Sequence, residues 1–207
     1  MKKLLFALSV LALAISPSVA RAQAGHEYSP LTETAVNYKN WSLPSLTADK
    51  SEDLRTLMVG KKLVMIVYFA PWCGNWRNEA PIAAKLYDKY KAQGFQVIGV
   101  SEYAMKDEVR SYFGEDGPPY PIVTESESRE DKQKTAHYGY RQLTGDKRNW
   151  GSPWNIFLEP TKVAATGDVL TEKAWVVNGE LIEDEVDKFI ASKVGAGTAT
   201  VIQPCKN

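Results

Sequence analysis

Cys73 is the residue of this chain best suited to covalent chemistry. It follows an apolar run over residues 63–69, which is typical of a buried strand, and it opens an amphipathic helical pattern. At the start of a helix, unpaired N–H groups and the helix dipole favour an anion, so the nucleophilic thiolate form of a cysteine is stabilised there. The sequence therefore predicts a reactive thiol at a strand-to-helix junction.

A second thiol is missing from the helix that Cys73 opens. A cysteine three residues further on would bring both sulfurs onto one face, near disulfide distance. That position is Trp76, which cannot form a disulfide. The other cysteine is Cys205, and the polar tail from Gly195 to Cys205 would span roughly 30 Å if extended. Cys205 is therefore an alternative resolving thiol.

The first 24 residues have the pattern of a signal peptide. A short basic start precedes an apolar stretch over residues 4–15, and Ala22-Gln23-Ala24 is a cleavage signal. An uncleaved membrane anchor is the alternative, but the apolar stretch is short for a span. We expect residues 1–24 to be removed and the mature chain to be exported, to the bacterial periplasm or cell envelope.

The charge of the chain argues against a nucleic-acid partner. The full sequence has 25 basic and 25 acidic residues, and losing Lys2, Lys3 and Arg21 with the signal peptide leaves 22 − 25 = −3. A mildly acidic chain without basic clusters is not typical of nucleic-acid binding. Its two histidines and two cysteines lack metal-ligand spacing, so we expect neither a metal site nor a cofactor.

The elements that must position Cys73 alternate between strands and helices. Apolar runs over 63–69 and 95–100 enclose a helical pattern over 74–93, and such a unit places both strands parallel in one sheet. Further strands are expected over 36–46, 120–124, 154–158 and, in two segments, 163–177, and further helices over 51–60, 106–113, 128–138 and 181–194. Residues 25–35 and 195–207 are expected to be flexible, which leaves one domain over 36–194.

The segment from Val64 to Pro81 resembles the exported thiol-disulfide oxidoreductases related to TlpA and ResA. Their pattern is a strand, then Trp-Cys-x-x-Cys-Arg/Lys-x-Glu-x-Pro, then a helix. The matching residues here are Trp72, Cys73, Arg77, Glu79 and Pro81, with Trp76 in place of the second cysteine. The resemblance extends over about residues 36–194 and implies an α/β, thioredoxin-like fold with a central mixed sheet flanked by helices.

The resemblance also implies roles for individual residues. Cys73 would attack a disulfide and Glu79 would assist in proton transfer. Pro153 would be a cis-proline that faces Cys73 and docks the substrate backbone. We also expect Ser152, Trp72 and Trp76 to contact the substrate, with Trp72 shielding the thiol. The implied partners are a protein or small-molecule thiol or disulfide and a membrane-bound electron donor.

Two positions allow a plainer interpretation. Without a second thiol, Glu79 is expected to be a solvated helix residue, and His137 is expected to be structural or exposed. The loop over 142–151 is longer than in the TlpA and ResA relatives. It is either a specificity loop beside the active site or a solvated loop without function.

Three functions remain open from the sequence. The first is a thiol-disulfide oxidoreductase that uses the single cysteine Cys73. The second is a non-catalytic binding module with an aromatic surface made of Trp72, Trp76, Trp150 and Trp154. The third is a peroxiredoxin-type peroxidase, which would need a hydroxyl three residues before the cysteine, where this chain has Ala70.

Overall fold

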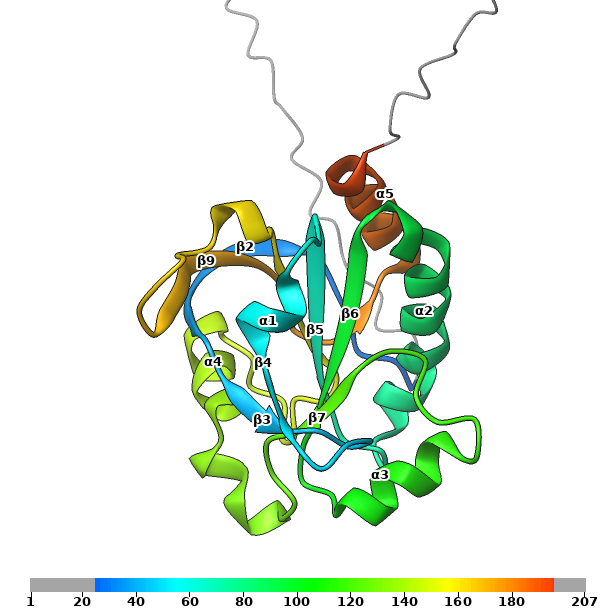
Figure 1. Ribbon diagram of the computed structural model, residues 1–207. Coiled ribbons are helices and arrows are strands. Elements are labelled where there is room, and N and C mark those ends of the chain that lie inside the picture. The colour runs from blue at the N-terminus through cyan, green and yellow to red at the C-terminus, as the bar shows by residue number, and fades with distance from the viewer. Residues whose placement is uncertain (1–24, 196–207) are drawn as a thin grey trace, which may run out of the picture.

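The computed structural model describes residues 25–195, and its centre is a six-stranded mixed sheet (Figure 1). Its strands, in order across the sheet, are β2 (Thr32–Lys39), β9 (Val169–Val177), β8 (Trp154–Leu158), β5 (Leu63–Phe69), β6 (Phe95–Ser101) and β7 (Ile122–Thr124). The strands β5, β6 and β7 are parallel, whereas β5 with β8, β8 with β9 and β2 with β9 pair antiparallel. The predicted thioredoxin-like α/β architecture is confirmed.

Helices cover both faces of this sheet (Figure 1). On one face lie α2 (Gly74–Tyr90) and α5 (Glu183–Val194), and on the other α1 (Leu54–Met58) and α4 (Ala136–Thr144). The helix α3 (Lys106–Phe113) follows β6. The remaining elements are the 3-10 helices η1 (Lys91–Gln93), η2 (Arg129–Lys134) and η3 (Pro160–Lys162) and the short strand pairs β1 (Tyr28–Ser29) with β10 (Glu180–Leu181) and β3 (Ser42–Pro44) with β4 (Ser51–Asp53).

The strand β5 explains why the sequence before Cys73 is apolar at every position. All seven of its residues are buried. Met65 and Val67 pack into the core on the α2 and α5 side, while Val64 and Ile66 pack on the α1 and α4 side. A strand covered on both faces needs apolar side chains throughout, in contrast to the alternating pattern of a half-exposed strand. This central strand fixes the position of Cys73 at its carboxyl end.

Residues 25–35 are not the loosely attached segment expected from the sequence. They contain β1, which pairs with β10, and the first part of β2, which pairs with β9. Side-chain contacts add to this: His26 Nδ1 lies 2.8 Å from Glu180 Oε2, and the Glu27 N–H donates to Glu180 Oε1 at 2.9 Å. Residues 138 or more positions away in sequence supply these partners, so the local composition could not reveal them.

Several other predicted elements have different bounds. The strand or hairpin expected over 36–46 is divided into the end of β2 and β3, which lie in different sheets. The helix expected over 128–138 is divided into η2 and α4, because Thr135 caps a new helix by accepting the Tyr138 N–H. The first of the two strand segments expected over 163–177 is a loop, and β9 begins at Val169. The helix expected from Ser51 begins at Leu54, after β4, with Asp53 as its cap.

The signal peptide expected over 1–24 and the thiol of Cys205 lie outside the described residues. Within residues 25–195, no helix is long and apolar enough to cross a membrane.

Candidate active site

Cys73 lies between the end of β5 and the first residue of α2, where it occupies the cap position of the helix. Its side chain is half-buried and has no disulfide partner among residues 25–195. The Cys73 thiol donates a hydrogen bond to the carbonyl oxygen of Ser152, with Sγ and O 3.1 Å apart. The Ser152–Pro153 peptide bond is cis. The fold therefore brings together the two segments that the sequence singled out, although 79 positions separate Cys73 from Ser152.

Ser152 connects the loop before β8 to the end of β5. Its hydroxyl oxygen accepts the Ala70 N–H at 2.9 Å, while its carbonyl accepts the Cys73 thiol. The side chain is 2% exposed. The Ser152 hydroxyl is therefore not exposed to a substrate. The hydroxyl is used within the protein, and Pro153 is also buried.

A buried ion network holds the other side of this loop, and the sequence analysis did not find it. Arg141 on α4 is 1% exposed, and its Nε donates to Asp146 Oδ2 at 3.0 Å. Arg148 donates to the same carboxylate and, through Nη2, to the Pro153 carbonyl oxygen at 2.7 Å. Burial alone would raise the pKa of Asp146, but hydrogen bonds and charge from Arg148 lower it below its usual value.

Gly151 is needed for this network to reach the cis-proline. Its φ of 62° lies in the left-handed region, and a Cβ at this position would collide with the Arg141 guanidinium group. The first three residues of the loop expected over 142–151 belong to α4, and the remaining loop over 145–151 is folded around a buried ion pair and contributes to placing Ser152 and Pro153. The sequence signal for this ion pair was the spacing of Arg141 and Asp146, which are five positions apart with Gly145 between them.

Glu79 is a buried residue, and the expectation of a solvated helix position was wrong. It is fully buried, and its Oε2 accepts the Leu181 N–H at 2.9 Å and Asn155 Nδ2 at 3.2 Å. Burial raises the pKa of Glu79 to about 8, although these two hydrogen bonds oppose the shift. Glu79 lies six residues after Cys73 on α2, which is about 9 Å along a helix axis. Within residues 25–195, no hydrogen bond joins the Glu79 carboxyl group to the Cys73 thiol.

His137 is structural, as one of the two interpretations of the sequence expected. It is fully buried, its ring stacks on Tyr68 with centroids 4.9 Å apart, and Nδ1 lies 3.2 Å from the Tyr103 hydroxyl. Burial lowers its pKa well below the usual value, so the imidazole is neutral at pH 7. Among the described residues, no hydrogen bond joins His137 to Cys73.

Trp76 and Trp154 belong to the core, which corrects the expected surface of four tryptophans. Both are fully buried. The Trp76 ring stacks on Phe69 with centroids 4.4 Å apart, and Trp154 Nε1 donates to Asn178 Oδ1 at 2.8 Å. The expected contact between Trp76 and substrate does not fit a side chain without exposed surface.

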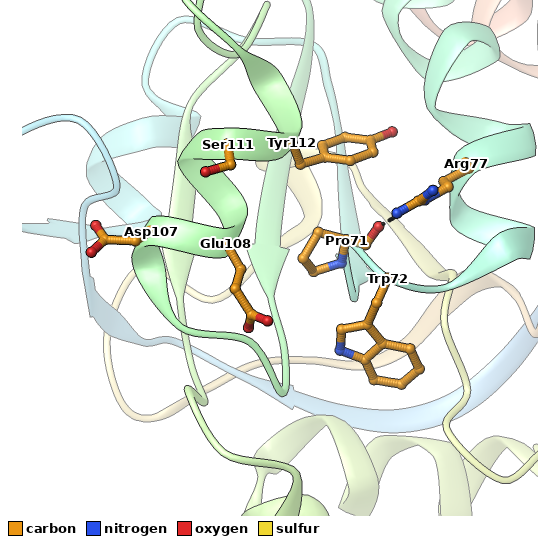
Figure 2. Close-up of a pocket in the computed structure, with 7 residues that line it drawn as sticks. All are labelled: Pro71, Trp72, Arg77, Asp107, Glu108, Ser111 and Tyr112. Carbon is orange, nitrogen blue, oxygen red and sulfur yellow. Dashed lines mark hydrogen bonds between the residues drawn. The ribbon is translucent and has the colours of Figure 1, made fainter.

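Trp72 and Trp150 remain beside Cys73 as half-buried residues. Their rings meet edge to face with centroids 5.2 Å apart, and Trp72 Nε1 donates to the Tyr103 carbonyl at 3.1 Å. On one side of Trp72 a groove of about 530 Å³ opens between α2 and α3. Figure 2 shows its lining, in which Arg77 reaches the Pro71 carbonyl oxygen, 3.1 Å from Nε, while Tyr112 and Glu108 come from α3.

Comparisons with known proteins agree with this geometry. A family model described as Redoxin matches residues 34–159. A curated relative, the probable protein disulfide-isomerase A4 of Caenorhabditis elegans, is 30% identical over 76 residues, which is 36% of this chain. The match spans only 12% of that relative's length.

Solved structures show the same fold. A thiol:disulfide interchange protein of the thioredoxin family from Chlorobium tepidum TLS superimposes with a TM-score of 0.54 at 20% identity, over 81% of this chain and 100% of that one. A putative thioredoxin from Neisseria meningitidis gives a TM-score of 0.52 at 22% identity, over 80% of this chain and 94% of that one. Together these likenesses establish the thioredoxin-like fold.

Proposed function

Because this chain belongs to the Redoxin family, we propose that it is an exported thiol-disulfide oxidoreductase that reacts through the single cysteine Cys73. The observation that carries this proposal is the contact between Cys73 Sγ and the Ser152 carbonyl, 3.1 Å apart, beside a cis-proline. It supports a half-buried thiol at the start of α2 facing a loop that could align a substrate chain. The start of a helix favours the thiolate form that such chemistry requires.

The reaction exchanges sulfurs in two balanced steps. The Cys73 thiolate attacks one sulfur of a substrate disulfide, a Cys73–substrate disulfide forms, and the other substrate sulfur leaves as a thiolate. A second thiolate then attacks the substrate sulfur of this mixed disulfide. The bond to Cys73 breaks, Cys73 leaves as the thiolate, and the substrate sulfur becomes joined to the incoming thiol.

The source of the second thiolate follows from Trp76. The indole lies where a Cys-x-x-Cys protein would carry its resolving thiol, so the helix offers no internal attack on the mixed disulfide. We propose that an external thiol, either from the substrate or from a small molecule, takes this role. Cys205 is the alternative within the chain.

Ionisation of Cys73 would free a group that binds substrate. A thiolate has no proton to donate, so the bond from Sγ to the Ser152 carbonyl is lost when the reactive form is made. The carbonyl oxygen is then available to an N–H of an extended substrate backbone. In this proposal Ser152 and Pro153 bind substrate through the backbone of their loop.

In this proposal Glu79 holds a proton and does not attack the substrate. With its pKa raised to about 8 by burial, it is mainly protonated at neutral pH and stores a proton in the core beside α2. The attack itself is assigned to Cys73.

A disulfide-reduction assay tests the proposal directly. With a monothiol supplied as reductant, the wild-type protein should reduce a protein disulfide well above background, and Cys73→Ser should return the rate to background. Equal rates for the two proteins would contradict the oxidoreductase proposal and favour a binding module.

The matched control is Cys205→Ser. If Cys73 works alone, this variant should keep the wild-type rate. A rate as low as that of Cys73→Ser would instead identify Cys205 as the resolving thiol.

A further inference from the structure

We propose that the surface beside Cys73 selects disulfides carried by an acidic polypeptide segment, which Arg129 and Lys132 bind. This inference rests on the proposed function of Cys73 and adds a substrate class to it. The surface consists of Trp72, Trp150, Arg129 and Lys132, and we refer to these four residues as the cationic rim.

The two indoles of the cationic rim flank the thiol from both segments of the site. Trp72 directly precedes Cys73, and Trp150 lies two positions before Ser152, whose carbonyl accepts the Cys73 thiol. The rings meet edge to face, with centroids 5.2 Å apart, and both side chains are partly exposed. A polypeptide joined to Cys73 would therefore have these rings beside it.

The two cations lie over these indoles. The Arg129 guanidinium carbon is 4.3 Å from the Trp72 ring centroid, and Lys132 Nζ is 4.7 Å from the Trp150 ring centroid. Lys132 Nζ also donates to Asn149 Oδ1 at 2.8 Å. Attraction to the ring faces holds both charges near the site, because the electron-rich face of an indole favours a cation. The 3-10 helix η2 carries both residues.

These two positive charges have no carboxylate partner within residues 25–195, unlike others on the same element. No ion pair is recorded there for Arg129 or Lys132, whereas Lys134 Nζ pairs with Asp131 Oδ1 at 2.8 Å. The chain without residues 1–24 has a formal charge of 22 − 25 = −3, and the stretch around η2 also carries Glu125, Glu127, Glu130 and Asp131. Arg129 and Lys132 therefore act at short range, through the two positive groups that lie against the indoles beside the site.

The acidic side chains across Trp72 are already engaged. Glu108 lines the groove of Figure 2, but its Oε2 accepts the Met105 N–H at 3.0 Å at the start of α3. Asp107 Oδ1 accepts Arg110 Nη1 at 2.9 Å. Asp107 and Glu108 thus place negative charge on the α3 side of Trp72, whereas Arg129 places a cation against its ring, so an acidic substrate residue is favoured on the side of the ring that Arg129 covers.

The reach of a polypeptide fits this arrangement. Once its cysteine is bonded to Cys73, each further residue extends the chain by about 3.3 Å. A carboxylate one to three residues from the reactive cysteine then comes within reach of the rings and of the cations above them. For exposed charge pairs of this kind we expect about a two- to fivefold effect on rate per cation.

The test uses three peptides that each carry one cysteine as a neutral pyridyl disulfide, flanked by Asp, Ser or Lys. Release of pyridinethione by the reduced protein, in a Cys205→Ser background, reports attack by Cys73. The expected order of rates is Asp, then Ser, then Lys, with the preference for Asp over Ser declining as salt is added. Arg129→Gln and Lys132→Gln should each lower that preference about two- to fivefold and leave the Ser peptide unchanged.

Two control variants separate charge from packing. Lys134→Gln removes a lysine from the same 3-10 helix that already has an acidic partner, and it should keep the preference for Asp. Arg129→Lys retains a positive charge and should keep most of the preference for the Asp peptide.

Two outcomes would overturn the inference, and they can be told apart. If the Asp and Ser peptides react equally, or if Arg129→Gln, Lys132→Gln and Lys134→Gln behave alike, the acidic substrate class is wrong while the reactivity of Cys73 stands. If no peptide reacts faster than with Cys73→Ser, the proposed function fails as well.

Discussion

Trp76 and Glu79 follow Cys73 on α2, and both side chains are buried in the core. They lie three positions apart on α2 and are both fully buried. Removing a buried tryptophan ring generally costs about 3–5 kcal/mol, because a cavity remains where the ring was packed. The residue at the position of the second thiol thus contributes to folding, and a cysteine there could not simply be restored without loss of packing.

At the residue scale, Glu79→Gln is expected to change how stability depends on pH. The pKa of Glu79 is about 8 in the folded protein, against a usual value of 4.5, so between these pH values only the folded chain binds this proton. Stability therefore falls as pH rises through this window, by on the order of 3 kcal/mol. Glutamine has no such proton, so the variant should lose less stability with pH.

Urea unfolding at pH 5, 6.5 and 8 measures this effect. The exposed substitution Glu130→Gln is the control and should follow the wild-type curve. Parallel curves for Glu79→Gln and wild type would show that the Glu79 proton does not contribute.

At the scale of elements, the loop from α4 to β8 places the cis-proline. Arg141 leaves α4 and binds Asp146 and the Arg148 carbonyl, and Arg148 in turn binds the Pro153 carbonyl. This arrangement joins a helix, a loop and the start of β8 through charged groups that are largely removed from water. Breaking one partner of such a buried network leaves an uncompensated charge, which is strongly destabilising.

Gly151→Ala should disrupt this loop more than Gly145→Ala does. Both glycines have positive φ, 62° and 77°, so the backbone strain of alanine is similar at both, about 1–2 kcal/mol. At Gly145 a Cβ meets no atom within 4 Å, whereas at Gly151 it collides with the Arg141 guanidinium group. We expect Gly151→Ala to lose about 2 kcal/mol more stability than Gly145→Ala, and this difference measures the cost of the collision with Arg141.

Denaturant unfolding and the rate of Cys73 with the Ser peptide measure both consequences. Gly151→Ala should also slow the reaction of Cys73 with the Ser peptide, because Gly151 directly precedes Ser152, whose carbonyl contacts the Cys73 thiol. Equal unfolding midpoints for the two alanine variants would contradict the role of Gly151 in the network.

At the scale of the whole molecule, the residues that would form the N-terminus after signal-peptide cleavage supply the partners of the buried Glu180 carboxylate. Glu180 is 1% exposed, and His26 and the Glu27 backbone bind its carboxylate. A mature chain that begins at Gly25 keeps these partners. The N-terminal segment is therefore part of the folded domain and not a tether outside it.

We expect the exported protein to begin at Gly25, and we expect a chain that begins at Pro30 to be less stable. Without residues 25–29 the pairing of β1 with β10 is lost, and the Glu180 carboxylate loses its contacts with His26 and the Glu27 N–H, which should cost about 1–3 kcal/mol. Intact mass of the exported protein and unfolding of both chains are the measurements.

The control for the shortened chain is Glu180→Gln in the chain that begins at Gly25, which weakens the same contacts and should lose part of the same stability. A mass that includes residues 1–24 would contradict cleavage, and equal stability of the two chains would contradict the role of Glu180.

Local sequence predicted much of the arrangement around Cys73. The apolar run over 63–69, the helix after it and the strand over 154–158 have patterns set by neighbouring residues, and the fold confirmed all three. The exact bounds of α3 were also predicted. Periodicity reports which face of an element is buried, and it needs no knowledge of the partner.

The sequence by itself determined that a lone thiol opens a helix after a buried strand, with a tryptophan where a second thiol would be. The tertiary structure alone decided that Glu79, Trp76 and Trp154 are buried, that Arg141, Asp146 and Arg148 hold the cis-proline loop, and that residues 25–35 join the sheets. The physical reason is that burial and ion pairing depend on what packs against a residue. For Glu79 and the N-terminal segment, those partners lie 76 to 154 positions away in sequence.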